Sequence, residues 1–266
     1  MRTRTITGII ALALLLPFVW YGSWPLVVGT SIMGVIGVSE FFMMKNKRFI
    51  SMTGLITSLI TIFIILPREY YAFLPTEFSI WHLFFLFGMI LLVMTVLSNN
   101  EFTFDDAGGF LLAALYIGNG FHYFVRTAEM GFLTVIFVLL TLWGTDIGAY
   151  IIGMRFGKNK LAPIISPNKS IEGSVGGMAV SVIVAIIYTN FHNPEQFTLP
   201  IVILLAVLIS IIGQLGDLTE SAFKRHFGVK DSGKILPGHG GILDRFDSML
   251  FVMPMFQIFL TIYRIF

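Results

Sequence analysis

Residues 199–216 read LPIVILLAVLISIIGQLG, a stretch that contains no charged side chain. As a helix that rises about 1.5 Å per residue, it nearly spans a hydrocarbon core of about 30 Å. The residues that follow, 217–247, read DLTESAFKRHFGVKDSGKILPGHGGILDRFD and are rich in charged side chains and glycine. In so apolar a chain, a cluster of this kind indicates a charged substrate.

The whole chain has the composition of an integral membrane protein. Of its 266 residues, 56% are hydrophobic and 12% are charged, whereas soluble domains carry roughly 25% charged residues. The mean hydropathy is +0.87. The chain has no cysteine, which excludes disulfides, thiolate metal sites and a cysteine nucleophile. We expect no nucleic acid among its partners.

Nine apolar stretches predict an all-α, polytopic fold with about nine transmembrane helices. They run over residues 6–22, 25–44, 50–66, 80–97, 107–125, 132–153, 174–190, 199–216 and 248–264. We expect residues 1–130 to form the N-terminal transmembrane helices. Residues 131–266 then form a C-terminal catalytic region with polar loops at 154–173 and 217–247.

The distribution of lysine and arginine predicts the orientation in the membrane. With the N-terminus inside, the basic residues near 2–4, 45–48, 155–169 and 224–245 all fall on the cytoplasmic side. We therefore expect a multi-pass protein of the cell (inner or plasma) membrane whose active site faces the cytoplasm. This topology, together with anionic lipid, is sufficient to explain the basic run 45–48.

The polar segment begins with side chains spaced for one helical face. Glu220 and Ser221 lie three and four positions after Asp217, and Lys224 lies four and three positions after them, which gathers the four side chains on one side of a helix. They predict a polar cleft that faces the cytoplasm. A solvated helix end is the alternative interpretation.

Glycines and a second carboxylate follow in the same segment. The glycines of 230–234 (KDSGK) and 237–241 (PGHGG) allow backbone N–H groups to approach phosphate oxygens. Mg²⁺ prefers carboxylate oxygens and keeps positions open for substrate phosphates. Asp217 and Asp244 are therefore the predicted Mg²⁺ ligands for phosphoryl or nucleotidyl transfer. The alternative is that they pair with Lys224 or Arg245 between helices.

The pattern S-x-x-K-R-x-x-x-x-K-D-x-G-x-x-x-P-x-H-G-G-x-x-D-R-x-D runs from Ser221 to Asp247. It closely resembles the signature of the bacterial phosphatidate cytidylyltransferases, the CDP-diacylglycerol synthases. The preceding GDLTES, residues 216–221, is similar to the family's segment before the signature. The resemblance implies transfer of CMP from CTP to phosphatidic acid in membrane lipid, with release of pyrophosphate, Mg²⁺ as cofactor and a homodimer.

Two further segments are similar to elements of the same family. WGTDIGAY at 143–150 matches W-x-x-D-T-x-A-Y, and SPNKSIEG at 166–173 matches S-P-x-K-S/T-x-E-G. Ile147 stands where the family often has a small hydroxyl residue, and Asn168 replaces a common Lys or Arg. Glu40 also fits the family. The segments add these residues to the implied substrate site: Asp146, Ser166, Lys169, Ser170 and Glu172.

Some of these residues also have a structural interpretation. Lys169 on its own reads as a lysine that extends to lipid headgroups, and Asp146 could hydrogen-bond Tyr150 one turn on. Residues 166–173 read as a polar loop that leads into a helix, whose first N–H groups Ser170 or Ser174 could cap.

Within the implied reaction we assign roles by residue type. Catalytic roles go to Asp217, Asp244, Lys224 and Arg245, and the remaining substrate contacts to Glu220, Ser221, Arg225, Lys230, Asp231, His239, Gly240, Gly241 and Asp247. His239 is interpreted as a hydrogen-bond donor to a phosphate group and not as a general base, because the attacking phosphate is already anionic.

Two other functions would use aspartates and basic loops. One is a polytopic Mg²⁺ transferase that moves a phospho-sugar onto a polyprenyl phosphate, which the H-G-G-x-x-D-R-x-D run fits poorly. The other is an ion-coupled transporter, whose frequent inverted repeat is missing here.

Overall fold

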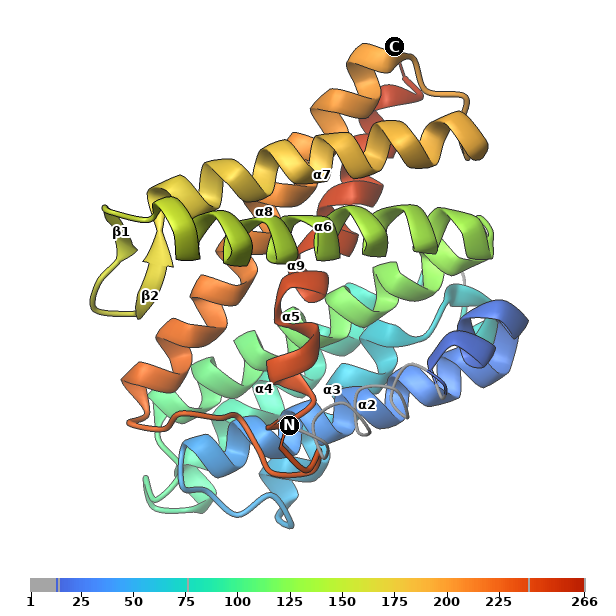
Figure 1. Cartoon of the computed structure of the whole chain (residues 1–266). Helices are drawn as coiled ribbons and strands as arrows, with labels where there is room; N and C mark the ends of the chain where they lie inside the picture. The colour runs from blue at the N-terminus through green and yellow to red at the C-terminus, as the bar shows by residue number, and fades with distance from the viewer. Residues whose placement is uncertain (1–12, 14, 76, 239, 266) are drawn as a thin grey trace. The chain divides into compact units, whose positions relative to one another are not determined.

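The computed structural model of the chain describes residues 13, 15–75, 77–238 and 240–265, and it confirms an all-α protein (Figure 1). The helices are α2 (Ser23–Met44), α3 (Met52–Ile65), η1 (Arg68–Tyr71), α4 (Ile80–Leu97), α5 (Phe104–Glu129), α6 (Phe132–Phe156), α7 (Ile171–Phe191), α8 (Leu199–His226) and α9 (Leu243–Tyr263). A small antiparallel hairpin, β1 (Lys160–Ala162) with β2 (Ser166–Ser170), joins α6 to α7. The predicted polar loop at 166–173 is therefore wrong in part, because a strand this short and polar lacks the alternation that marks a strand in sequence.

Six of the described helices are long and apolar enough to cross a membrane: α2, α4, α6, α7, α8 and α9. The predicted count of nine is not confirmed. Helix α3 has 14 residues, about 21 Å at the helical rise, and α5 carries polar side chains such as Asn119 and His122. About half of the predicted first span, residues 6–12 and 14, lies outside the described residues, and 15–21 are helical. A membrane-embedded helical protein fits all of these observations.

The chain forms two compact units. Unit 1 comprises the described residues of Met1–Arg126 and Val229–Arg245, and unit 2 those of Thr127–Gly228 and Phe246–Phe266. The glycine-rich segment before α9 is thus grouped with the N-terminal helices. The predicted division near residue 130 remains a prediction about function.

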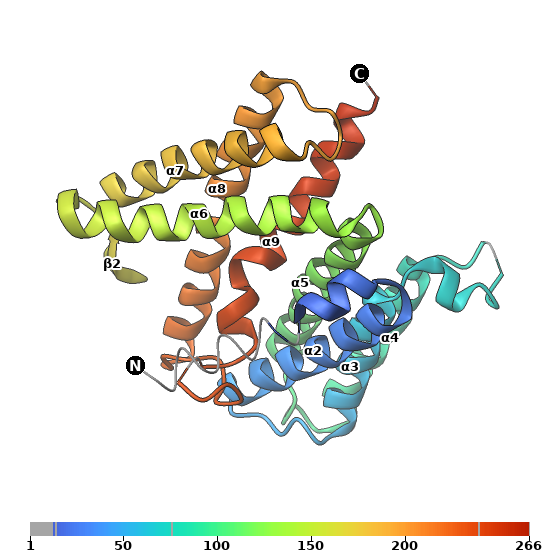
Figure 2. The ribbon, with the colours of Figure 1, turned by 45° about the vertical axis from the view of Figure 1, so that its right-hand side comes forward.

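In unit 1 the N-terminal helices pack closely on one another. Helix α2 contacts α3, and α3 contacts α4, as Figures 1 and 2 both show. Phe42 and Phe110 are fully buried and stack with their ring centroids 3.7 Å apart. A Cβ at Gly34 would lie 2.6 Å from the Ile65 side chain, so the absence of a side chain there allows α2 to approach α3. As a result, most side chains in the last turns of α2 are buried inside the unit.

In unit 2, α6 and α7 run side by side along their length (Figure 2). Their contact uses small residues: a Cβ at Gly148 would lie 3.0 Å from the Gly177 Cα, and one at Gly177 2.6 Å from the Thr145 carbonyl oxygen. Small residues at such interfaces let membrane helices approach closely. Helix α8 meets α9 in the same way, because a Cβ at Gly216 would lie 2.8 Å from the Asp247 carbonyl oxygen. That approach brings Asp217 toward Asp247.

Candidate active site

The end of α8 presents the polar face that the residue spacing predicts. The helix continues past the apolar stretch to His226. Along this extension the Ser221 hydroxyl donates to Asp217 Oδ1 at 3.3 Å, and Lys224 Nζ pairs with Glu220 Oε2 one turn earlier. Glu220 is fully buried, which excludes the interpretation of the whole face as a solvated helix end.

Three aspartates of unit 2 interact electrostatically with one another. They are Asp146 from α6, Asp217 from α8 and Asp247 from α9, and we call them the carboxylate cluster. Lys169 attracts Asp146, and Lys224 attracts Asp247. Asp247 also accepts a hydrogen bond from the N–H of Ser248 at 2.6 Å. Like charges are costly to hold together, so this arrangement favours the binding of a cation.

Lys169 links the hairpin to this cluster. Its ammonium group lies 2.7 Å from Asp217 Oδ2, and the two side chains are 27% and 34% exposed. The contact joins the SPNKS segment to the GDLTES segment, as the predicted cleft requires. Lys169 is therefore more than a lysine that extends to lipid headgroups. Tyr150, by contrast, is 67% exposed and makes no hydrogen bond with Asp146.

The other predicted residues of this region hold the hairpin in shape. Ser170 caps α7, since its hydroxyl accepts from the N–H of Gly173 at 3.1 Å, as predicted. Glu172 accepts hydrogen bonds from the N–H groups of Lys158 and Asn159 at 3.0 and 3.2 Å. Arg225 Nε donates to the Ile165 carbonyl at 3.2 Å. Ser166 begins β2, opposite Ala162.

A second group of polar residues lies in unit 1, in the segment 229–243 that we call the glycine loop. Asp244, in the first turn of α9, accepts at Oδ2 from the N–H groups of Ser232 and Gly241, both at 2.8 Å. The φ of Gly240 is 83°, and a Cβ there would lie 2.4 Å from Asp244 Oδ2. In this structure the N–H of Gly241 therefore donates to the Asp244 carboxylate and not to a phosphate group. His239 lies outside the described residues.

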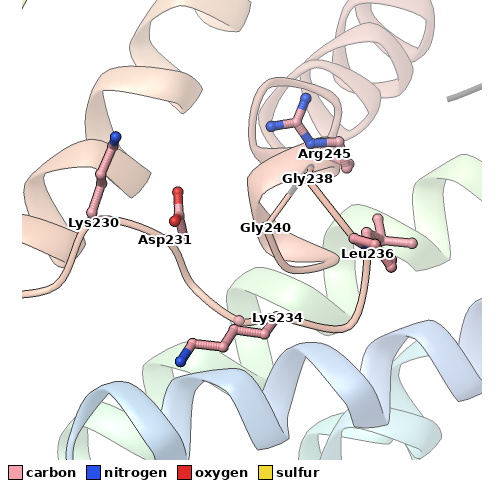
Figure 3. A pocket seen from close by; sticks show the side chains of 9 residues that line it. Lys230, Asp231, Lys234, Leu236, Gly238, Gly240 and Arg245 are labelled. Carbon is pink, nitrogen blue, oxygen red and sulfur yellow. The ribbon is translucent and has the colours of Figure 1, made fainter. Parts of the chain in front are cut away.

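The glycine loop borders an open cavity of about 470 Å³. Lys230, Asp231 and Lys234 of the loop line it, together with Arg245 from the first turn of α9 (Figure 3). Three cations beside one carboxylate suit the binding of phosphate groups. Lys230, Asp231 and Arg245 were assigned from sequence, whereas Lys234 and Glu40 received no role. For Lys234 the available signal was its place in the basic, glycine-containing run.

The acidic residues fit the chemistry of Mg²⁺ binding, although they are not arranged around one point. Across the described parts of the chain, no group of three or more His, Asp or Glu side chains is positioned to hold a metal ion. Asp217 has oxygens that already attract a cation, Lys169. The assignment of Asp217 and Asp244 to Mg²⁺ stays a prediction, and the carboxylate cluster adds Asp146 and Asp247 as candidates beside Asp217.

The basic run 45–48 has a structural role that topology alone did not predict. Lys45 and Lys47 lie 2.8 and 2.7 Å from the two carboxylate oxygens of Asp106, a residue that is 5% exposed. Burial would raise the pKa of Asp106, but the hydrogen bonds from Lys45 and Lys47 outweigh it and hold this pKa well below its usual range. The interpretation of these lysines as topology signals is therefore incomplete.

Comparison with known proteins gives consistent matches along the whole chain. The sequence model of the cytidylyltransferase family matches residues 2–263. A phosphatidate cytidylyltransferase of Staphylococcus epidermidis is 44% identical over 262 residues, which cover 98% of this chain and 99% of that protein. Proteins with the same name are 45% identical over 260 residues in Staphylococcus haemolyticus and 44% identical over 264 residues in Staphylococcus aureus, with the same shares covered.

Proposed function

The chain belongs to the cytidylyltransferase family, and we propose that it is a nucleotidyltransferase that makes CDP-diacylglycerol from CTP and phosphatidate. The observation that carries this proposal is the identity of about 44% over 98% of the chain to phosphatidate cytidylyltransferases. The resemblance that the sequence motifs indicated is thereby confirmed at the level of the family. The product places the enzyme in phospholipid biosynthesis.

In the proposed reaction a phosphate oxygen of phosphatidate attacks the α-phosphorus of CTP. The new P–O bond joins CMP to the lipid phosphate, the bond between the α-phosphorus and the bridging oxygen to the β-phosphorus breaks, and pyrophosphate leaves. A phosphate monoester is anionic near neutral pH, because its second pKa is about 6. No side chain therefore has to remove a proton, and positioning and electrostatics can supply most of the rate.

The cations of the chain would hold the phosphate groups. Lys230, Lys234 and Arg245 line the cavity of the glycine loop. In unit 2, Lys169 forms an ion pair with Asp217. Ammonium and guanidinium groups bind phosphate oxygens by charge-assisted hydrogen bonds, and they stabilise negative charge that develops on the leaving pyrophosphate.

The carboxylates would hold Mg²⁺ rather than transfer protons. Asp217, with Asp146 and Asp247 near it, and Asp244 supply the oxygen ligands that Mg²⁺ prefers. When bound, the ion would neutralise charge on the triphosphate. Lys169 would then balance the negative charge that remains on Asp217. The cytoplasmic orientation of these residues and the homodimer stay predictions.

The proposal is tested with purified protein and CTP that carries a radiolabel on either the α- or the γ-phosphate. With phosphatidate present, the α-label should enter a lipid product and the γ-label should appear in pyrophosphate. A protein that leaves both labels in water-soluble nucleotide is not a phosphatidate cytidylyltransferase. A transporter or a phospho-sugar transferase would give that negative result.

A further inference from the structure

Glu40 is a buried acidic residue whose contacts all come from distant parts of the chain. It lies near the end of α2 and is 1% exposed. Its Oε1 accepts from the N–H of Ile242 at 2.7 Å. Its Oε2 accepts from the N–H of Leu243 at 2.9 Å and from the Ser232 hydroxyl at 3.0 Å. A buried carboxylate needs such donors, since its charge is otherwise left without compensation.

Two of these donors belong to the start of α9. Helix α9 begins at Leu243, and the first N–H groups of a helix have no acceptor within the helix itself. Glu40 therefore caps α9 from another helix, and its negative charge lies at the end of α9 where the helix dipole is positive. The contact fixes the point at which the glycine loop ends.

Ser232 connects Glu40 to Asp244. The Ser232 Oγ lies 3.0 Å from Glu40 Oε2 and 2.9 Å from Asp244 Oδ2. Because the hydroxyl has a single hydrogen, the two carboxylates share it as donor. The N–H of Ser232 donates separately to Asp244 at 2.8 Å. One serine thus ties the first half of the loop to both acidic residues.

The glycines of the loop are shaped around Glu40. A Cβ at Gly233 would lie 2.7 Å from Glu40 Oε1, and one at Gly241 2.4 Å from both carboxylate oxygens. These separations are far below van der Waals contact, so a side chain at either position would push the loop away from Glu40. Close contact with Glu40 therefore explains why Gly233 and Gly241 are glycines, and this explanation does not require a bound phosphate.

We infer that Glu40 is a positioning residue for phosphate binding by the glycine loop, an inference that rests on the proposed function. Glu40 is too deeply buried to touch a substrate. It fixes both ends of the segment 232–243, and Lys234 lies within that segment while Lys230 and Arg245 flank it. Through the loop, Glu40 sets the positions of the three cations that line the cavity.

The test is Glu40→Gln, which keeps the volume and replaces one oxygen by an amide NH₂. The glutamine should direct its oxygen to the two donors at the Oε2 position, so its NH₂ group faces the N–H of Ile242. Hydrogen–deuterium exchange in detergent should then become at least ~10-fold faster in peptides that cover 232–243, with α7 peptides unchanged. Titrations of CTP and of phosphatidate should show a KM raised about tenfold for the substrate that the loop binds, with a smaller change in kcat.

Two further variants make the test specific. Ser39→Ala is the matched control, because the Ser39 hydroxyl donates to the Ile36 carbonyl of its own helix and should leave both measurements unchanged. Ser232→Ala removes the shared hydroxyl but keeps both backbone bonds to Glu40. It should raise exchange and KM in the same direction by a smaller factor, and it serves if Glu40→Gln folds poorly.

Two results would overturn the inference. One is exchange in the loop that matches the unmodified protein in both Glu40→Gln and Ser232→Ala. The other is faster exchange with unchanged KM for both substrates, which would reduce Glu40 to a structural cap. An unmodified protein that makes no labelled lipid from CTP would refute the proposed function instead. The exchange data would still show whether Glu40 holds the glycine loop in place.

Discussion

Replacing Lys169 by alanine removes the ammonium group that lies 2.7 Å from Asp217. If this lysine serves the reaction, either by contact with a phosphate group or by balancing the carboxylate cluster, Lys169→Ala should lower turnover. One charge-assisted contact contributes about 1.5–3 kcal/mol, which corresponds to a loss of about ten- to hundredfold at roughly 1.4 kcal/mol per tenfold.

The effect on stability should be much smaller. Lys169 and Asp217 are 27% and 34% exposed, so water screens their attraction, and such pairs typically contribute about 0–1 kcal/mol. For a chain of this size, 1 kcal/mol shifts the unfolding temperature by about 2–4 °C. The expected combination is therefore a large loss of activity with an unfolding temperature within a few degrees of the unmodified protein.

The assay titrates CTP and phosphatidate separately in one detergent and compares Lys169→Ala with Lys160→Ala. Lys160 lies in β1 of the same hairpin, and it is exposed, so its loss changes the net charge equally and should alter activity less than about twofold. Lys45 is an unsuitable control because it pairs with the buried Asp106. Equal, minor effects of the two substitutions would refute the reasoning and leave Lys169 as a structural ion-pair partner of Asp217.

Three other experiments test separate parts of the structure. Asp217→Asn and Asp244→Asn should each lower CTP-dependent turnover at least ~10²-fold, and chelation of Mg²⁺ should abolish turnover until Mg²⁺ is restored; an aspartate whose variant stays near normal at saturating Mg²⁺ is not a ligand. Asp106→Asn should lower the unfolding temperature at neutral pH. Because the pKa of Asp106 is held below its usual value, this difference should shrink as the pH falls below about 4, and a difference that grows in acid would contradict the ion pairs. Finally, cysteines introduced singly at the exposed Lys158 and Asp231 of this cysteine-free chain should react alike with an impermeant thiol reagent from one side; opposite sidedness would exclude a shared cytoplasmic face.

Patterns that act over a few residues predict a large part of this protein. The uncharged stretch at 199–216 predicts a membrane helix, and α8 contains it. The spacing of Asp217, Ser221 and Lys224 predicts their common face, and Ser170 caps α7 as its position before the helix suggests. The family motifs at 143–150, 166–173 and 221–247 indicate the enzyme class, which the full-length comparison confirms.

Other features depend on how the helices pack. The ion pairs of Lys45 and Lys47 with Asp106 join residues about sixty positions apart, and the basic run alone reads as a topology signal. The short hairpin before α7 has no apolar alternation to indicate it. The number of membrane spans also depends on the folded structure. Hydropathy marks an apolar stretch at 50–66 but does not reveal that its helix has only 14 residues.

Glu40 shows the physical reason most clearly. An ionisable residue inside an apolar span signals a function, but it does not name a partner. The partners are the N–H groups of Ile242 and Leu243, which lie 202 and 203 positions further along the chain. Helical periodicity relates residues three or four positions apart, whereas a contact of this range exists only once α2 and the start of α9 have packed together.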